Sequence, residues 1–339
     1  MPSDDLVRPE LNAPMTDSIF EDIEQAGEQL IEVRTGISRV IFGQESVIDE
    51  TLITLLSGGH LLLLGVPGLA KTRLVETLGT VLGLDSRRVQ CTPDLMPADI
   101  VGSEILDETE DGRAFRFIPG PVFTQMLMAD EINRASPRTQ SALLQAMQER
   151  EVSVAGQTHP LPKPFHVLAT QNPIEQEGTY PLPEAQLDRF LLQVNVDYPD
   201  PDAERQMLLV TTGLEDRQPS QVMNAAQLIK AQNLVRRLPV GESVVEAILA
   251  LVRSGRPGVS DRTEISDWVA WGPGPRASQA LMLATRARAL LQGRVSPSVD
   301  DVVALAPAVL RHRMALNFAA RADGRTLDEV IDSLCDPFK

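Results

Sequence analysis

The chain has 339 residues, a formal net charge of −16 and 43% hydrophobic residues. This length and apolar content can bury one large domain or two moderate ones, which excludes an intrinsically disordered protein. The acidity argues against nucleic acid as a partner, because phosphate backbones repel a negative chain unless its basic residues gather on one face.

Cysteine and histidine usage gives no sign of a disulfide framework or a transition-metal site. The two cysteines, Cys91 and Cys335, are far apart, no CxxC pair occurs, and there are only four histidines. The N-terminal segment is polar and acidic, unlike a signal peptide. The longest purely aliphatic run, Leu61 to Leu64, is too short to span a bilayer. We therefore expect a cytoplasmic protein without direct membrane insertion.

The first part of the chain alternates predicted helices and strands. Residues 1–18 predict a flexible acidic tail. Helices are expected at 19–40, 46–56 and 74–82, and short buried strands at 60–64, 126–129 and 165–170. Between the last two strands, a helix is expected to begin with Ser136 as N-cap and Pro137 as its first residue. This alternation predicts an α/β domain over residues 19–198, a three-layer αβα arrangement with a parallel sheet.

The sequence changes character near Tyr198-Pro199-Asp200-Pro201, and only helical periodicity follows. The clearest predicted helices lie at 244–252, 277–291 and 299–310. Clusters of Pro and Gly, such as Gly272-Pro273-Gly274-Pro275, separate them. We therefore expect a smaller all-helical domain over residues 199–339.

A Gly-rich loop, Gly65-Val66-Pro67-Gly68-Leu69-Ala70-Lys71-Thr72, lies between the first expected strand and its helix. A phosphate-binding loop needs inward-pointing backbone N–H groups, a lysine for the β- and γ-phosphates and a hydroxyl for Mg²⁺, and Lys71 and Thr72 fit the last two roles. The helix adds its positive N-terminal end. The strict pattern GxxxxGK[ST] has Gly where this chain has Ala70, which can adopt fewer backbone angles. The alternative is an ordinary Gly-rich turn.

Two carboxylates, Asp130 and Glu131, follow the apolar run at 126–129. Asp130 can hold Mg²⁺, usually through water, and Glu131 can orient and polarise an attacking water. Alone, such a pair is more often a strand end that meets solvent. Downstream of a phosphate-binding loop, it indicates nucleotide hydrolysis.

Three further residues are candidates for the same reaction. Asn172 follows the strand expected at 165–170 and could sense the γ-phosphate, or it could simply be a turn residue before Pro173. Arg189 could reach the γ-phosphate of a neighbouring subunit, although most arginines form surface salt bridges. Arg276 opens a helix of the second domain and could contact phosphate, or it could lie at a solvated helix start.

Together these motifs resemble the MoxR family of AAA+ ATPases from about residue 40 to residue 313. Beside the loop, the most specific stretches are Ala129-Asp130-Glu131-Ile132-Asn133-Arg134-Ala135, Thr139-Gln140-Ser141-Ala142-Leu143-Leu144, Ala169-Thr170-Gln171-Asn172-Pro173, Pro183-Glu184-Ala185-Gln186-Leu187-Asp188-Arg189-Phe190 and Val309-Leu310-Arg311-His312-Arg313. Members of this family often have Ala at the position of Ala70.

The resemblance implies a role for each motif. Walker A is Gly65 to Thr72, Walker B is Asp130 with Glu131, sensor 1 is Asn172, the arginine finger is Arg189 and sensor 2 is Arg276. Gly43 and Gln44 fall where such proteins contact adenine. Two β-hairpins are implied, one pairing 105–107 with 114–117 and one over 152–161 that turns near Gly156. The helical domain would be the lid.

The resemblance also implies what the protein does. It would bind and hydrolyse ATP with Mg²⁺ in a homo-oligomeric, probably hexameric ring, and act as a chaperone-like remodeller or maturation factor for a protein client. Because no von Willebrand A-like domain is recognisable in the chain, we expect such a domain in a separate partner.

Three other functions remain open at this point. A nucleic-acid motor of a related AAA+ branch shares the core, but the net charge and the lack of basic-aromatic clusters count against it. A nucleotide switch or scaffold without turnover is disfavoured by Glu131 and Arg189. The ATPase subunit of a metal chelatase shares the same motifs and depends on its partners.

Overall fold

The computed structural model describes residues 17–339, apart from 110–111, 175–177 and 214–217. Most of the tail expected at 1–18 therefore lies outside the described residues, and residues 17 and 18 already belong to helix α1 (Asp17–Ser38). Within the described ranges, no helix is long and apolar enough to cross a membrane.

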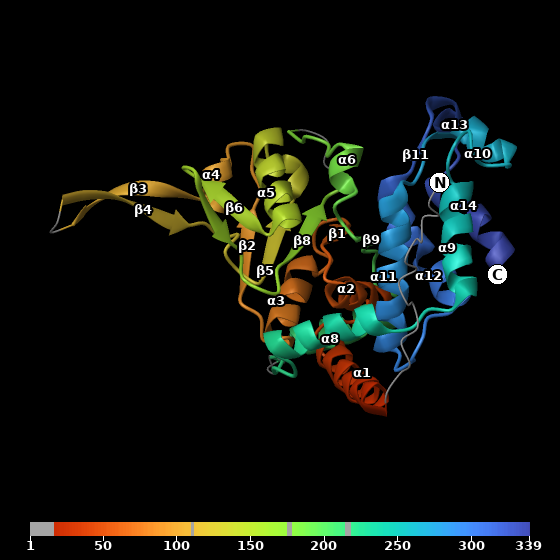
Figure 1. Ribbon diagram of the computed structural model, residues 1–339, viewed down its shortest axis with the longest axis horizontal. Coiled ribbons are helices and arrows are strands. Elements are labelled where there is room, and N and C mark those ends of the chain that lie inside the picture. The colour runs from red at the N-terminus through yellow and green to blue at the C-terminus, as the bar shows by residue number, and fades with distance from the viewer. Residues whose placement is uncertain (1–16, 110–111, 175–177, 214–217) are drawn as a thin grey trace, which may run out of the picture.

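A five-stranded parallel sheet forms the centre of the first part of the chain (Figure 1). Its strands are β1 (Leu61–Leu64), β2 (Ser86–Gln90), β5 (Met126–Asp130), β8 (His166–Gln171) and β9 (Leu192–Asn195). Their spatial order is β2-β5-β8-β1-β9. The strands expected from apolar runs are confirmed as β1, β5 and β8. The sequence analysis missed β2, a polar and mostly exposed edge strand, and β9, which is only four residues long.

Successive residues of these strands point to opposite faces of the sheet and bury both. Leu61 and Leu63 join one apolar cluster with helices α1, α2 (Glu45–Leu56) and α3 (Lys71–Val81). Leu62 joins the cluster on the other face, formed with α4 (Pro97–Val101) and α5 (Pro137–Glu149). The predicted three-layer αβα arrangement is therefore confirmed. As predicted, Ser136 caps α5, and its side chain accepts a hydrogen bond from the N–H of Thr139.

Two antiparallel hairpins extend from this core. The first pairs β3 (Gly102–Thr109) with β4 (Gly112–Pro119) and projects away from the body of the molecule (Figure 1). The second pairs β6 (Glu151–Val154) with β7 (Gln157–Pro160). Both implied hairpins are confirmed, although residues 110–111 of the first turn lie outside the described ranges.

Helices dominate the chain after β9. They are α7 (Pro201–Thr211), α8 (Ala225–Arg237), α9 (Glu242–Ser254), α10 (Thr263–Trp268), α11 (Pro275–Leu291), α12 (Val299–Leu310), α13 (Phe318–Ala322) and α14 (Leu327–Cys335), with short 3-10 turns η2 (Arg311–Arg313) and η3 (Asp336–Phe338). The all-helical expectation needs one correction, because β10 (Val269–Trp271) and β11 (Ala315–Leu316) form an antiparallel pair. Strands of three and two residues are too short for an alternation of apolar and polar residues to be recognised in the sequence.

The helical part packs directly on the αβα core. Helix α11 contacts α2, and α8 lies against α1 and α2 as well as against α11 (Figure 1). One apolar cluster runs continuously from β1 and α2 into α11 and α12. A division at residue 198 stays a proposal, because α8 follows it in sequence and still packs on helices that precede the sheet.

Two buried histidines, His60 and His166, lie at the amino end of the sheet. His60 accepts a hydrogen bond at Nδ1 from the N–H of Val167 (2.9 Å), so its Nε2 carries the proton and donates to the carbonyl of Met147 (3.1 Å). His166 donates from Nδ1 to the carbonyl of Gly59 (2.8 Å). Burial lowers the pKa of His60 to about 3 and that of His166 to about 4. Both rings are therefore neutral in the folded protein at pH 7.

The free energy of unfolding should fall as the pH drops below 6.5, the ordinary histidine value. The unfolded chain then binds protons that the folded chain excludes, and the loss continues until the pH reaches the folded pKa values near 4 and 3. Each histidine lowers the free energy of unfolding by at most roughly 1.4 kcal/mol per pH unit in this range. Urea unfolding of the wild type and of His166→Gln between pH 7.5 and 5 measures this slope. The variant should show a shallower decline, and equal slopes would contradict the assignment.

Candidate active site

The Gly-rich loop connects the carboxyl end of β1 to the first turn of α3. Gly68 and Ala70 both have left-handed backbone conformations, with φ of 87° and 55°. Alternation of right- and left-handed residues turns successive N–H groups toward one concave side, which can hold an anion. Ala70 adopts this conformation despite its Cβ, at a cost of about 1 kcal/mol. The replacement of Gly by Ala thus leaves the expected loop geometry in place.

Lys71 is the first residue of α3 and folds back over the loop. Its Nζ donates to the carbonyl oxygens of Gly65 (2.5 Å) and Val66 (2.8 Å). Burial lowers the pKa of Lys71, while the carboxylates of Asp130 and Glu131 oppose that shift. The ammonium group is therefore held at the loop, in the lining of the same cavity as the acidic pair, where it can contact a phosphate.

A cavity of about 380 Å³ brings the loop together with the ends of β5 and β8. Its lining consists of Pro67, Gly68, Leu69, Ala70, Lys71, Thr72, Arg73, Asp130, Glu131, Thr170, Gln171 and Asn172. Carboxyl ends of parallel strands meet at one edge of a sheet, which is where α/β proteins bind ligands. The fold thus brings the Gly-rich loop, the pair Asp130 and Glu131, and Asn172 to one cavity. We refer to this space as the phosphate cavity.

Asp130, the last residue of β5, is held in the cavity wall by two neighbouring strands. Thr170 of β8 donates from Oγ1 to Asp130 Oδ1 (2.6 Å), and Arg88 of β2 donates from Nη2 to Oδ2 (2.6 Å). The sequence analysis missed Thr170 and Arg88. The position of Thr170 beside Asp130 follows from the strand register, in which Ala129 is paired with Ala169. This contact can therefore be predicted only once that pairing is known.

Glu131 has a left-handed backbone, with φ 53° and ψ 53°, which is uncommon for a residue with a Cβ and is often found at functional sites. Its N–H donates to Thr170 Oγ1 (2.8 Å). Its Oε2 accepts hydrogen bonds from Gln90 Nε2 (3.0 Å) and Arg134 Nη1 (3.2 Å). Backbone and side chain are thus both fixed, and the carboxylate reaches the cavity from a set direction.

Thr72 and Asp130 fit the expected magnesium site. Hydroxyl and carboxylate oxygens are hard ligands, and Mg²⁺ usually takes one or two protein ligands and completes its shell with water and phosphate. Within the described ranges, no group of three or more His, Cys, Asp or Glu residues could hold a metal by itself. The donor set therefore suits an ion that arrives with a nucleotide.

Asn172 lines the phosphate cavity just beyond β8. Its Oδ1 also accepts a hydrogen bond from the N–H of Ile174 (3.1 Å). Both interpretations of this residue are therefore compatible with its position: the residue lines the cavity, and its side chain also stabilises the following turn.

Gly43 and Gln44 lie outside the described lining of the phosphate cavity. Gln44 donates from Nε2 to the carbonyl of Asp197 (2.8 Å). Gly43 has φ 64°, and a Cβ there would lie 2.5 Å from the Cβ of Ala203. A Cβ on Gly65 would lie 2.7 Å from the carbonyl of Val196, so the same segment after β9 also borders the loop. The residues expected to contact adenine thus border the same segment, 196–203, as the loop does, and that role stays a prediction.

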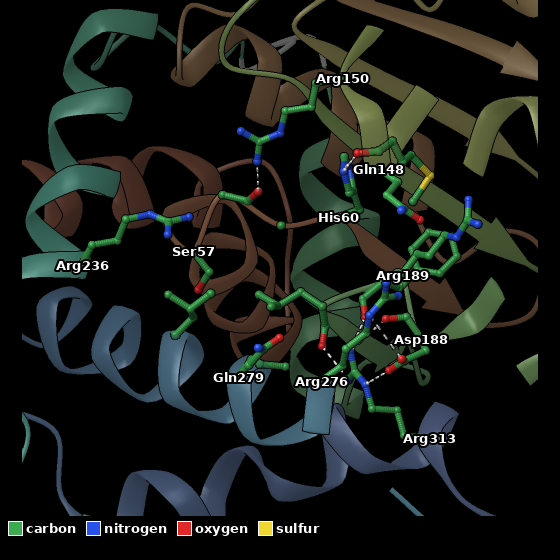
Figure 2. Close-up of a pocket in the computed structure, with 17 residues that line it drawn as sticks. Ser57, His60, Gln148, Arg150, Asp188, Arg189, Arg236, Arg276, Gln279 and Arg313 are labelled. Atoms are coloured by element: carbon green, nitrogen blue, oxygen red, sulfur yellow. Dashed lines mark hydrogen bonds and ion pairs between the residues drawn. The ribbon is translucent and has the colours of Figure 1, made fainter. Parts of the chain in front are cut away.

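A second cavity, of about 290 Å³, lies at the other end of the sheet and is rich in arginine (Figure 2). It borders residues 57–60, which precede β1, whereas the phosphate cavity follows β1. Five arginines contribute to its lining: Arg150, Arg189, Arg236, Arg276 and Arg313. We refer to it as the arginine cavity.

Arg189 and Arg276 both lie in the arginine cavity and not at the phosphate cavity of the same chain. Nε of Arg276 lies 3.7 Å from Oδ2 of Asp188. Among the described residues, the guanidinium group of Arg189 has no hydrogen bond or ion pair. The sequence could not show this juxtaposition, because Arg189 precedes β9 and Arg276 begins α11, far along the chain.

Comparison with known proteins agrees with this geometry. A family model described as "ATPase family associated with various cellular activities (AAA)" matches residues 60–192, and one described as "AAA lid domain" matches residues 262–334. A crystal structure of an ATPase candidate from Cytophaga hutchinsonii superposes with a TM-score of 0.86 at 35% identity, covering 94% of this chain and 97% of that one.

Curated relatives match nearly the full length of the chain. Chaperone MoxR1 of Mycobacterium tuberculosis is 44% identical over 87% of this chain and 78% of its own length. YeaC, an uncharacterised protein of Bacillus subtilis, is 40% identical over 89% and 92% of the two chains. Protein MoxR of Methylorubrum extorquens is 32% identical over 83% and 85%. Together with the Gly-rich loop and the acidic pair at one cavity, these matches establish that the chain belongs to the MoxR family of AAA+ ATPases.

Proposed function

We propose that this protein hydrolyses ATP in a homo-oligomeric, hexameric ring and uses the energy to remodel or mature a protein complex. The observation that carries the proposal is the separation of two half-sites. The phosphate cavity lies at the carboxyl end of the sheet and the arginine cavity at the amino end. Head-to-tail contact between copies would join one cavity to the other, and such contacts close into rings when the rotation allows.

The chemistry follows from what each residue can reach. The loop N–H groups and Lys71 would bind the phosphates, and Thr72 with Asp130 would hold Mg²⁺, which neutralises phosphate charge when bound. Glu131 would orient the attacking water and take up its proton. Arg189 and Arg276 of the next copy would neutralise the charge that develops on the γ-phosphate.

The first hairpin is the surface that we propose for the protein partner. Leu106 and Phe115 form a cross-strand pair and are 52% and 73% exposed. Exposed apolar pairs on a projecting element favour contact with another protein. At the base of the hairpin, Phe117 stacks on His159 of the second hairpin, with ring centroids 4.0 Å apart. This contact would let both hairpins move together when the nucleotide bound to the core changes from ATP to ADP.

We further propose that the partner carries a von Willebrand A-like domain and binds more tightly to the ATP state. The proposal is supported by the family relationship together with the exposed hairpin. A ligand shifts a protein between two states only if it binds one of those states better. Nucleotide and partner should therefore affect each other's affinity for this protein.

Capture of partners by Glu131→Gln protein with ATP, and again with ADP, tests this function. A protein with a von Willebrand A-like domain should be retained with ATP and largely released with ADP. Adding Phe115→Ala should weaken retention, because it removes the exposed ring from the hairpin. Phe318→Ala is the matched control, because Phe318 is an 80% exposed aromatic residue on α13. Retention of nucleic acid without protein would instead favour the nucleic-acid motor.

A further inference from the structure

Asp188 lies between two arginines that differ in burial. Its Oδ1 accepts a hydrogen bond from Arg313 Nε (2.7 Å), and its Oδ2 lies 3.7 Å from Arg276 Nε. The side chain of Arg313 is 3% exposed, whereas that of Arg276 is 50% exposed. One carboxylate thus connects a buried cation to an exposed one (Figure 2).

Arg313 fastens the segment that carries Asp188 and Arg189 to the helical part of the chain. From η2 it donates to the carbonyls of Phe190 (2.6 Å) and Leu191 (3.0 Å), and also to Val309 (2.7 Å) in α12. His312, the preceding residue, also contacts the Phe190 carbonyl through Nε2 (3.0 Å). The motif Val309-Leu310-Arg311-His312-Arg313 therefore clamps the backbone between Asp188 and β9.

The charges in the arginine cavity explain why a carboxylate is needed there. Arg189 and Arg276 line one space of about 290 Å³ together with three more arginines. Like charges in one cavity repel, and an exposed arginine side chain can turn away into solvent. Among the described lining residues, Asp188 is the one carboxylate. It offsets part of the repulsion and still leaves the cavity with excess positive charge for phosphate.

We propose that Asp188 is a positioning residue, which is anchored by Arg313 and holds Arg276 beside Arg189 so that both can reach a neighbouring copy's nucleotide. The inference rests on the proposed function of the two arginines. Asp188 itself would not touch the nucleotide. Its contribution should therefore appear in the rate of hydrolysis by the neighbour and not in the affinity of its own phosphate cavity.

Asp188→Asn tests the proposal while keeping the size and shape of the side chain. The amide oxygen can still accept from Arg313, but the charge that attracts Arg276 is gone. We expect kcat of the assembled protein to fall by about tenfold, as for the loss of one close charge contact. The Kd for Mg-ATP should change little. The melting temperature should fall, because the buried Arg313 loses its counter-charge, so kcat is measured well below that temperature. Asp188→Glu keeps the charge and should retain most of the activity.

Asp328→Asn is the matched control. Oδ1 of Asp328 lies 2.6 Å from Nε of Arg311. Arg311 belongs to the same η2 turn as Arg313, and Asp328 does not line the arginine cavity. This variant removes a carboxylate of the same kind and should leave kcat unchanged. An equal decrease in both variants would assign the effect to the stability of the turn and overturn the proposal.

A double-mutant cycle decides whether Asp188 acts through Arg276. If it does, Asp188→Asn should slow the Arg276→Ala protein no further. Two results would overturn the positioning role alone. In the first, Asp188→Asn lowers the kcat of the Arg276→Ala protein as much as it lowers that of the wild type. In the second, Arg276→Ala is slow but Asp188→Asn has the kcat of the wild type. Wild-type kcat for both Arg276→Ala and Arg189→Ala would instead refute the proposed function of the arginine pair, and this inference with it.

Discussion

Replacing Glu131 with glutamine should leave Mg-ATP binding intact and reduce turnover by roughly a hundredfold or more, the range for loss of a positioned general base. The Glu131 carboxylate reaches the phosphate cavity from a fixed direction, held by Gln90 and Arg134. A glutamine amide oxygen can accept the same two hydrogen bonds, so the local geometry should persist. An amide cannot take up the proton of the attacking water, so the chemical step should fail.

Calorimetry and phosphate release together measure the two halves of this result. The Kd for Mg-ATP should match that of the wild type, while both steady-state and single-turnover hydrolysis fall. Glu149→Gln is a suitable control, because Glu149 also accepts a hydrogen bond from a glutamine side chain but lies at the end of α5, away from the cavity. Normal turnover by Glu131→Gln would place the base elsewhere, and lost binding would give Glu131 a structural role.

The parts of this site that are contiguous in sequence could be predicted from it. A phosphate-binding loop is one uninterrupted segment between a strand and a helix, so its type and order of residues carry the signal. The same is true of Asp130 and Glu131 at the end of an apolar run. The left-handed conformation of Ala70 could not be predicted from its residue type, because glycine is the residue that normally adopts it.

The parts that depend on strand order were missed. Arg88 and Gln90 belong to β2, a polar edge strand without the apolar run that indicated β1, β5 and β8. Thr170 lies next to Asp130 only because β8 pairs in parallel with β5 in a particular register. Such neighbours are separated by about 40 residues or more, so no local pattern connects them.

Topology also decides where the two candidate arginines lie. Both follow from motifs, but sequence alone leaves open which phosphate each could reach. Arg189 lies just before the amino end of β9, a strand parallel to β1, so it lies opposite the loop that follows β1. Arg276 lies in the first turn of α11 and lines the same cavity. One chain therefore holds the phosphate cavity and the two candidate arginines at opposite ends of its sheet.

Arg189→Ala should reduce turnover of the assembled protein by on the order of a thousandfold, the lower range for a lost arginine finger. Lys71→Ala should be similarly inactive, because it removes the phosphate contact made by the ammonium group above the loop. The two defects lie in different cavities. If Arg189 acts on the neighbouring copy, a mixture of the two variants should recover part of the lost activity.

The expected recovery follows from how the two variants meet in a mixed ring. In an equal mixture, about a quarter of the head-to-tail interfaces should join an intact loop from an Arg189→Ala copy to an intact Arg189 from a Lys71→Ala copy. Phosphate release across a series of mixing ratios should therefore be highest near equal amounts. Mixing Lys71→Ala with the double variant Lys71→Ala/Arg189→Ala is the control, because no interface in it has an intact loop. If co-assembly is demonstrated and the test mixture stays as inactive as this control, Arg189 does not act in trans.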